Sequence, residues 1–356
     1  MEQRNNLVLQ GTETFSRGQL DNVALDGGAL VLDSVAGRCL QYGSYTTPEF
    51  AMPAFCNLNV SWNAFAPHNT MVEVRCRVYA GGSWTGWMSF GKWAPGYPRC
   101  SCNSQSDDGM IFLMGDTVTV ATPGGGTGVQ LQVNLSTNDD KVSPAVRLLA
   151  AAVRPLAWEK HNGHPLNRQL YLPEYCLSAH DPSFGRTMDL PLVMAALMNC
   201  WGEDVLPEEV AYVMEDMAHQ HHCQCAFAAA AAGCCGYPCW QAWMDLADLR
   251  ARSTMTAVWQ CRWSGASAAS GTRCGSGWPA RLWPRRCRNG RLCAAERPHR
   301  RFQRRSELHH GTGGLYALLY RARHRPAGKT PRCCRQPSAA DALRAGARRD
   351  GRRLLF

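Results

Sequence analysis

Residues Met71 to Tyr79 read MVEVRCRVY, a run in which apolar side chains alternate with polar and charged ones. Similar alternation recurs in TVTVAT (Thr117 to Thr122) and VQLQVNLS (Val129 to Ser136), and clusters of Gly, Pro, Asn and Asp separate these segments. Because successive side chains of a strand point to opposite faces, each segment predicts a strand with one buried face. Short strands at this spacing are typical of an antiparallel β-sandwich. We therefore predict a β-sandwich domain over residues 18–155.

The period of the pattern changes after a polar connection, Trp158 to Leu170, that is typical of a linker. Between residues 190 and 198, apolar side chains recur at steps of three and four, which predicts an amphipathic helix that ends near Gly202. A second helix is predicted at Pro207, because proline and the two glutamates after it suit a first helical turn. An Ala-rich segment ends at Gly233, and residues 245–252 indicate the start of a further helix.

The last part of the chain has a different composition. Residues 1–250 contain 14 Lys and Arg against 24 Asp and Glu, a net charge of 14 − 24 = −10, whereas residues 251–356 contain 24 against 4, a net charge of 24 − 4 = +20. Of these 24 basic residues, 23 are arginines, and Ala, Gly and Pro are frequent beside them. G/C-rich codons encode these residue types, so the bias is what a shifted reading frame of a G/C-rich gene would produce. We expect residues 253–356 to be an irregular basic segment, and the coding DNA around residue 253 is the direct test of a frameshift.

Nucleic-acid binding is the alternative function of this basic segment. Arginine clusters such as Arg285, Arg286 and Arg288 would neutralise phosphates, and Trp278 and Trp283 could stack on bases. No recognised nucleic-acid-binding motif accompanies them. A nucleic-acid partner is therefore not expected.

The eighteen cysteines show no regular spacing, which argues against a disulfide scaffold in a chain of 356 residues. A metal site is the other use of cysteine to consider, because Cys223 and Cys225 follow three histidines and precede Cys234 and Cys235. The histidines are His219, His221 and His222, and Cys239 follows the second cysteine pair. CxC and CC pairs stand where zinc sites usually carry CxxC. We predict no metal site and no cofactor.

The first residues, MEQRNNLVLQ, contain no apolar segment of the kind found in signal peptides. The most apolar run, Ala226 to Cys235, is too short to cross a bilayer. The expectation is a protein without a membrane partner, placed in the cytoplasm by default.

Two stretches carry a resemblance to a known family. The segment SWNAFAPHNTMVEVRCRVYAGGSWTGWMSFGKW, from Ser61 to Trp93, resembles the β-sandwich that precedes the peptidase in C39-like peptidases of gut Firmicutes. The segment LPEYCLSAHDPSFGRTMDLPLVMAALMNCWGEDVLPEEVA, from Leu172 to Ala211, resembles the start of their papain-like domain. The resemblance implies an α+β multidomain protein with a β-sandwich and a truncated papain-like cysteine-peptidase domain at residues 168–252. It covers residues 18–252.

Intact members of the family are thiol peptidases that act on a peptide or protein substrate through Cys, His and Asp or Asn. The resemblance places Asp189 at the position of the nucleophilic cysteine and Leu177 at the position of the oxyanion-binding glutamine. A carboxylate caps a helix start well, but it is a poor nucleophile for acyl transfer. Cys176 lies in the preceding loop and Cys200 near the predicted helix end, so neither has the helix-start position that stabilises a thiolate.

The family's histidine and its partner would follow residue 252, where no matching sequence remains. We therefore expect a protein that resembles a cysteine peptidase and is catalytically inactive. A glycan-binding or cell-wall-binding sandwich is the alternative function, with an aromatic face built from tryptophans. The tryptophans in question are Trp62, Trp84, Trp87 and Trp93, whose other interpretation is packing in the core.

Overall fold

The structure is a computed structural model that describes residues 5–94, 99–157, 175, 187–200, 203–244, 259–263 and 315–320. The chain divides into two compact units, Met1–Ala322 and Arg323–Phe356, and every described residue belongs to the first.

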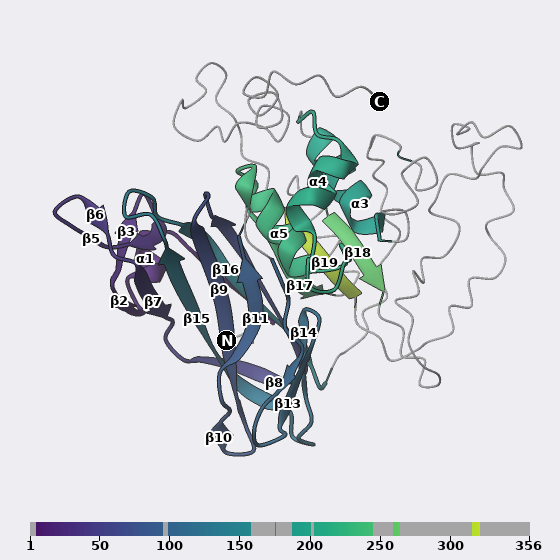
Figure 1. Cartoon of the computed structure of the whole chain (residues 1–356). Coiled ribbons are helices and arrows are strands. Elements are labelled where there is room, and N and C mark those ends of the chain that lie inside the picture. The colour runs from purple at the N-terminus through teal and green to yellow at the C-terminus, as the bar shows by residue number, and fades with distance from the viewer. Residues whose placement is uncertain are drawn as a thin grey trace, which may run out of the picture. The chain divides into compact units, whose positions relative to one another are not determined.

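Fourteen of the strands form one antiparallel sheet, which is shown in Figure 1. The long strand β8 (Phe50–Phe65) explains why the sheet is continuous. Its first residues pair with β15 (Gly126–Thr137), and its later residues pair with β14 (Thr117–Val120) on one side and β16 (Ala145–Pro155) on the other. Because β8 passes from one group of strands to the other, the two layers expected of a sandwich join into a nearly closed, barrel-like sheet.

The remaining strands attach to these four. On the side of β15 lie β2 (Gln19–Asp21), β7 (Tyr42–Thr46), β9 (Thr70–Ala80), β10 (Ser83–Trp84) and β11 (Met88–Trp93). On the side of β16 and β14 lie β1 (Asn6–Gln10), β3 (Val23–Asp26), β4 (Ala29–Leu32), β12 (Ser104–Gln105) and β13 (Ile111–Met114). The short helix α1 (Thr12–Phe15) follows β1, and β5 (Ser34–Val35) pairs with β6 (Arg38–Cys39) in a separate hairpin.

The three segments that predicted strands are β9, β14 and β15, so the antiparallel β prediction is confirmed. In β9 the alternate residues Val72, Val74, Cys76 and Val78 are fully buried in the core, as the pattern requires. The sheet starts before the predicted boundary at residue 18, because β1 pairs with β16 along all five of its residues.

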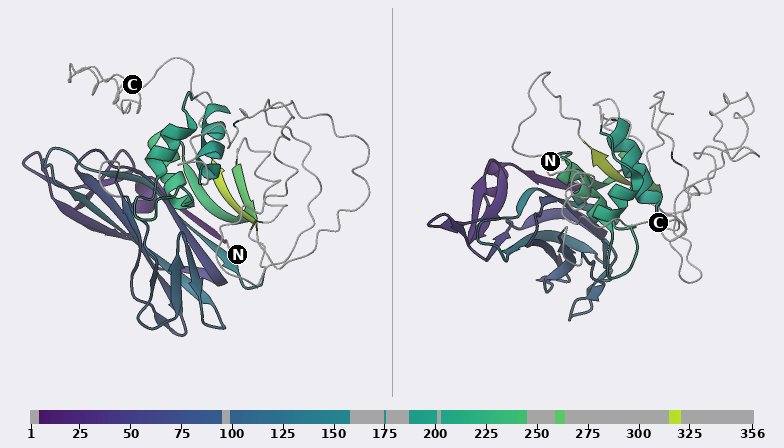
Figure 2. Two further views of the ribbon diagram at one scale, coloured as in Figure 1. Left: turned by 45° about the vertical axis from the view of Figure 1, so that its right-hand side comes forward. Right: turned by 45° about the horizontal axis from the view of Figure 1, so that its top comes forward.

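Two helices follow at the predicted places, α3 (Asp189–Cys200) and α4 (Pro207–Met214), and the Ala-rich segment forms α5 (Cys225–Cys234). Helix α4 starts at its proline, and the Glu209 carboxylate accepts a hydrogen bond of 2.9 Å from the backbone N–H of Leu206, which satisfies one group at the helix start. Figure 2 shows these helices beside the β-sheet.

The described residues beyond position 253 are two short strands. β18 (Trp259–Trp263) and β19 (Leu315–Tyr320) form an antiparallel sheet with β17 (Cys239–Met244), in the order β17-β19-β18, and the prediction of an irregular basic segment stays a prediction for the remaining residues. Hydrogen-bond pairing between residues far apart in sequence cannot be read from composition alone. The predicted linker at 158–170 and the predicted helix at 245–252 lie outside the described residues, as does the rest of the basic segment.

Helix α5 and strand β17 contact β8 through Asn59, Ser61 and Asn63. The apolar side chains of β8 that alternate with these three, including Trp62, belong to the hydrophobic core, which Phe227 of α5 also joins. These three polar side chains are only 1%, 0% and 5% exposed. Asn63 Nδ2 donates to the carbonyl oxygens of Ala229 and Cys239 at 3.0 and 2.7 Å, and its Oδ1 accepts from the Cys239 N–H at 3.0 Å.

The contact continues along β17. Ser61 Oγ accepts a hydrogen bond of 3.0 Å from the Gln241 N–H, and Asn59 Oδ1 accepts one of 2.8 Å from the Trp243 indole. Asn6 on β1 exchanges two bonds of 3.1 Å with the backbone of Trp243. The polar side of β8 therefore satisfies backbone groups of Cys239 and Gln241 in β17, and it adds a hydrogen bond to the Ala229 carbonyl of α5.

Gly233 permits this close approach. A Cβ added at Gly233 would lie 2.5 Å from the Cβ of Asn63, which is far inside van der Waals contact. The helix can therefore contact β8 at this position only through a residue without a side chain.

We predict that Asn63→Ala lowers the free energy of unfolding by roughly 2–4 kcal/mol, because it leaves the buried N–H and C=O of Cys239 without their partner and removes the bond to Ala229. Asn57→Ala is the matched control, since Asn57 is on the same face of β8 and donates to Thr119 at an exposed position. Urea unfolding of both variants measures the difference. Equal losses in the two variants would contradict the assigned role of Asn63.

Candidate functional site

Asp189, at the expected nucleophile position, is the first residue of α3. The helix predicted from the periodicity of residues 190–198 is confirmed. Tyr175, two residues before the expected oxyanion position, lies beside the other end of α3, where Asn199 Nδ2 donates to its hydroxyl at 2.6 Å. Leu177, at the expected oxyanion position, and Cys176 lie outside the described residues.

A histidine contacts the residues just before α3. His222 is buried, and its Nδ1 lies 2.7 Å from Thr187 Oγ1. Burial, the largest influence, lowers the pKa of His222, so the ring is neutral at neutral pH. His222 thus joins the loop after α4 to the start of α3.

The described cysteines with a resolved pKa shift are poor thiolate nucleophiles. Burial raises the pKa of Cys76, Cys234 and Cys239 to about 12, whereas a catalytic cysteine needs a lowered pKa. Cys200 is the last residue of α3 and so lies at the negative end of its helix dipole.

Cys225 starts a helix, which sequence analysis did not consider. It is the first residue of α5 and is buried, and its backbone N–H donates to Asp116 Oδ2 at 3.0 Å. The Asp116 carboxylate thus occupies the positive end of α5, and its charge would repel a thiolate beside it. This arrangement argues against Cys225 as a nucleophile.

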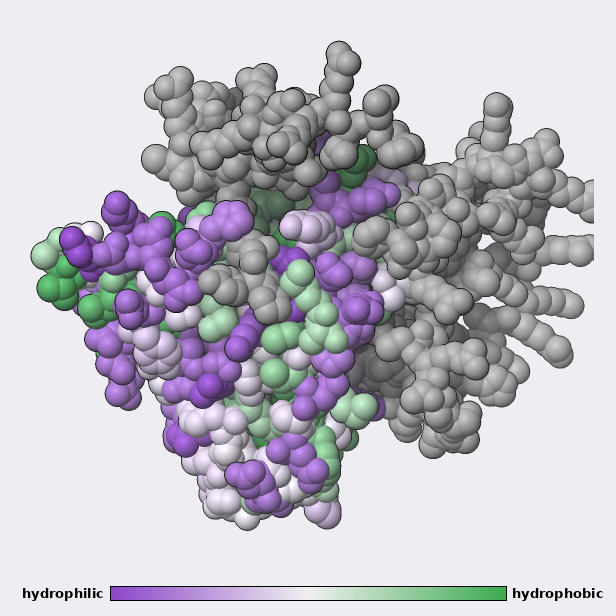
Figure 3. Space-filling view, in the orientation of Figure 1, coloured by the Kyte–Doolittle hydropathy of each residue, from purple (hydrophilic) through white to green (hydrophobic). Residues whose placement is uncertain are grey.

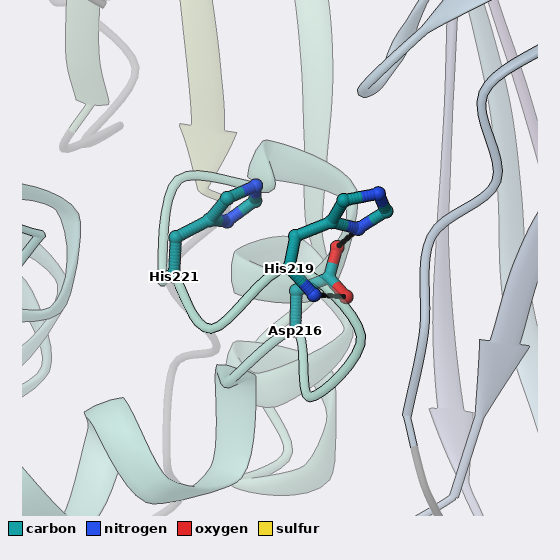
Figure 4. Close-up of side chains that lie close together, drawn as sticks. All are labelled: Asp216, His219 and His221. Atoms are coloured by element: carbon teal, nitrogen blue, oxygen red, sulfur yellow. Dashed lines mark hydrogen bonds and ion pairs between the residues drawn. The ribbon is translucent and has the colours of Figure 1, made fainter.

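A cluster of three potential metal ligands, Asp216, His219 and His221, lies in the loop after α4 (Figure 4). The loop is closed by an antiparallel bridge in which the Asp216 N–H donates to the His221 carbonyl at 2.8 Å. Gln220, between the histidines, has a φ of 52°, and the two imidazole rings stack with centroids 5.7 Å apart. His219 Nδ1 lies 3.1 Å from Asp216 Oδ2.

Asp216 is fully buried and held from several sides. The Ser101 hydroxyl and N–H both donate to its Oδ2, and the backbone N–H of Ala218 donates to its Oδ1 at 3.2 Å. Gln224 Nε2 in turn donates to Ser101 Oγ at 3.0 Å. Burial acts to raise the pKa of Asp216, but the hydrogen bonds from Ser101 and His219 outweigh it, and the net pKa lies below the usual range. The carboxylate is therefore charged at neutral pH.

Ser101, His219 and Asp216 do not form a serine-hydrolase triad. Ser101 Oγ lies 3.3 Å from His219 Nδ1, which is the same nitrogen that faces Asp216. In a triad the serine contacts Nε2 while the carboxylate holds Nδ1. Ser101 therefore does not have the geometry for acyl transfer. Asp216, His219 and His221, in contrast, could hold a metal ion.

The sequence pattern groups His219 and His221 with cysteines. Among the described residues, the group that could hold a metal contains Asp216 in place of any cysteine. The Asp-x-x-His-x-His spacing was the available signal. It was missed because Ser101 and Gln224, which orient the aspartate, are distant in sequence.

Arg99 fastens this loop to the β-sheet. Its side chain is only 1% exposed, its Nε donates to the Glu215 carbonyl at 3.3 Å, and its Nη2 donates to the carbonyl of Tyr212 in the last turn of α4. Burial is the largest influence on this guanidinium and lowers its pKa. The Met217 N–H also donates to the Arg99 carbonyl at 2.8 Å. Residues 99–101 thus cap α4 and position Asp216.

The four tryptophans divide into two pairs. Trp62 and Trp93 are 0% and 2% exposed and contact Phe227 of α5, so they belong to the core. Trp84 and Trp87 are half-buried, and the Arg77 guanidinium lies over both rings at 4.9 and 5.1 Å. Only this second pair remains available for an aromatic binding face.

No broad apolar surface is visible among the coloured residues in Figure 3, where hydrophobic and hydrophilic residues are interspersed. Within the described part of the chain, no helix has the length and apolarity needed to cross a membrane.

Comparison with known families relates the N-terminal part of the chain to C39 peptidases. A family model described as the peptidase C39 N-terminal domain matches residues 5–153. The matching model is of the actinobacterial type, so it does not support the expected relation to gut Firmicutes. The match includes β1, which the predicted domain omitted. No curated protein matches the chain.

Three solved structures show a distant likeness to this chain. The C-terminal CBM6 of LamC from Zobellia galactanivorans has 11% identity and a TM-score of 0.24, covering 41% of this chain and 98% of that chain. The Emp46p carbohydrate recognition domain has 14% identity and a TM-score of 0.23, covering 38% and 88%. The structure of infectious bursal disease virus Gt strain has 10% identity and a TM-score of 0.23, covering 43% of this chain and 33% of that chain. Likenesses at this level carry no functional argument.

We predict that Ser101→Ala lowers the free energy of unfolding at neutral pH by about 2 kcal/mol, because Asp216 loses a hydrogen bond to its charged form. The depressed pKa of Asp216 contributes stability above the unfolded-state value of about 4, and this contribution is lost as pH falls through the folded-state pKa. The difference between wild type and variant should therefore shrink in acid.

Urea unfolding at a series of pH values measures this difference. Ser104→Ala is the control, because Ser104 is exposed and lies near Ser101 in sequence. If Ser101→Ala lowered the free energy of unfolding by the same amount at every pH down to the most acidic, the bond to a charged Asp216 would be contradicted.

Proposed function

We propose that this chain is a non-catalytic relative of C39 cysteine peptidases that acts by binding, with its β-domain holding the helical remnant of the peptidase domain. The single observation that carries the proposal is the carboxylate of Asp189 at the start of α3. In intact relatives the expected partner is a peptide or protein substrate. Binding of such a partner without cleavage is the function that the residues of this chain fit best.

The physical reason lies in the chemistry of acyl transfer. A sulfur at a helix start is stabilised as a thiolate by the helix dipole, and it forms a covalent acyl intermediate. A carboxylate at the same position is stabilised by the same dipole, but its nucleophilic chemistry belongs to glycosyl and phosphoryl transfer. The family's histidine is also missing from the recognisable sequence after residue 252. The out-of-frame reading of residues 253–356 accounts for this loss and remains part of the proposal.

We predict that the wild-type chain does not cleave peptides and that Asp189→Cys creates a reactive thiol without restoring cleavage. The helix dipole should lower the pKa of the new thiol by about one unit, which raises its thiolate fraction about tenfold at neutral pH. Iodoacetamide labelling followed by peptide mapping measures the rate at each cysteine. Cys200, at the opposite end of the same helix, is the internal control.

Peptide cleavage by the wild type that is lost in Asp189→Ala would sink the proposal. Equal labelling rates at position 189 and at Cys200 would show instead that this helix start does not activate a thiol.

Glycan binding is the second candidate function, and the pair Trp84 and Trp87 favours it. Arg77 lies over both rings, its Nε donates to Gln130 at 2.6 Å, and Tyr79 packs edge-on against Trp84 at 5.5 Å. Half-exposed aromatic rings with fixed polar neighbours suit stacking on a sugar ring, with hydrogen bonds to its hydroxyl groups.

We predict that Trp84→Ala weakens binding to purified peptidoglycan about tenfold, which corresponds to the loss of one aromatic contact of about 1.4 kcal/mol. Phe112→Ala is the control, because Phe112 is a partly exposed aromatic residue on β13, outside this group. Pull-down isotherms with insoluble peptidoglycan measure the affinity. Absence of wild-type binding, or equal binding by Trp84→Ala, would remove this candidate.

A further inference from the structure

The loop Asp216–His221 brings three donor groups together at a place that is open to solvent on one side. Asp216 is fully buried, whereas the His219 side chain is 37% exposed and His221 is partly exposed. The left-handed conformation of Gln220 sets both imidazoles on the same side of the loop, as Figure 4 shows. The charged Asp216 carboxylate therefore lies at the buried side of the cluster, and the imidazoles of His219 and His221 lie nearer to solvent.

The spacing of the donor atoms fits a small cation. One donor atom from each residue lies within 4.8 Å of the others. Ligands of a tetrahedral zinc ion, at about 2.0–2.1 Å from the metal, lie about 3.3 Å apart. The separation of 3.1 Å between His219 Nδ1 and Asp216 Oδ2 is already close to this value. The partly exposed His221 supplies the third donor atom, within 4.8 Å of the other two.

We propose that Asp216, His219 and His221 bind a divalent transition-metal ion, with Zn²⁺ as the best fit. Two imidazoles and one carboxylate select zinc, cobalt, nickel or copper over magnesium and calcium, which prefer oxygen ligands alone. Three protein ligands leave one tetrahedral position for water. The site is independent of the proposed loss of peptidase activity.

Neighbouring residues orient the Asp216 carboxylate by hydrogen bonds, as the outer partners of metal ligands do. Gln224 donates to Ser101, and Ser101 donates to Asp216, so the carboxylate is oriented by a chain of hydrogen bonds from α5's start and from the β-domain. Such outer partners fix the direction of ligand oxygens and contribute to metal affinity. Arg99 holds the same loop by donating a hydrogen bond to the carbonyl of Glu215.

Titration of the full-length reduced protein with Co²⁺, followed by displacement with Zn²⁺, tests the site. Tetrahedral cobalt gives visible absorption bands, and cysteine ligands add a strong near-ultraviolet band that oxygen and nitrogen ligands do not give. The expected result is a stoichiometric visible signal without the thiolate band. His219→Ala and His221→Ala should each weaken binding by more than about 100-fold, and Ser101→Ala by roughly tenfold.

His68→Ala is the matched control, because His68 is an exposed histidine in a turn of the β-domain and should leave cobalt affinity unchanged. Circular dichroism verifies the fold of each variant, which both histidine variants should keep, because neither imidazole is fully buried. The proposal is overturned by unchanged affinity in His219→Ala and His221→Ala, by a thiolate band in the wild-type spectrum, or by the absence of cobalt binding.

Discussion

Backbone groups buried between β8 and the segment α5–β17 impose the constraint on which the rest of this structure depends. A helix and a strand that pack against a sheet face bring N–H and C=O groups out of water, and each needs a partner. Ser61 and Asn63 of β8 supply such partners to the backbone of α5 and β17, and Asn59 accepts a hydrogen bond from the Trp243 indole beside them. Their inward neighbours fill the apolar core, so one strand stabilises both the β-domain and its contact with the helices.

Buried polar groups are also paired by hydrogen bonds where residues 99–101 contact the end of α4 and the loop after it. Arg99 donates to carbonyls at the end of α4, and Ser101 donates to the buried Asp216. Because the charges of Arg99 and Asp216 are buried, each is stabilised by hydrogen bonds rather than by solvent. The loop that carries His219 and His221 is thereby held at both its start and its aspartate. A cluster of donor atoms in such a loop keeps its geometry without a disulfide.

These contacts change how the chain compares with a cysteine peptidase. Helix α3 starts at the carboxylate of Asp189, where a sulfur was expected. The buried thiols of Cys76, Cys234 and Cys239 have raised pKa values. Chemistry that depends on a thiolate is therefore disfavoured at these three cysteines, while polar contacts hold the helices to the β-domain. Binding functions are compatible with this combination.

Local patterns in the sequence by themselves determined the strands β9, β14 and β15 and the helices α3 and α4, because periodicity and helix-start chemistry act over a few residues. Only the tertiary structure decided that Asn59, Ser61 and Asn63 are buried, since alternation marks them as the solvent side of a strand. It also decided that Asp216 belongs with His219 and His221, because the Ser101 bond that orients it joins residues 115 positions apart. Contacts between distant segments satisfy buried polar groups, and no local pattern records which segment will supply the partner.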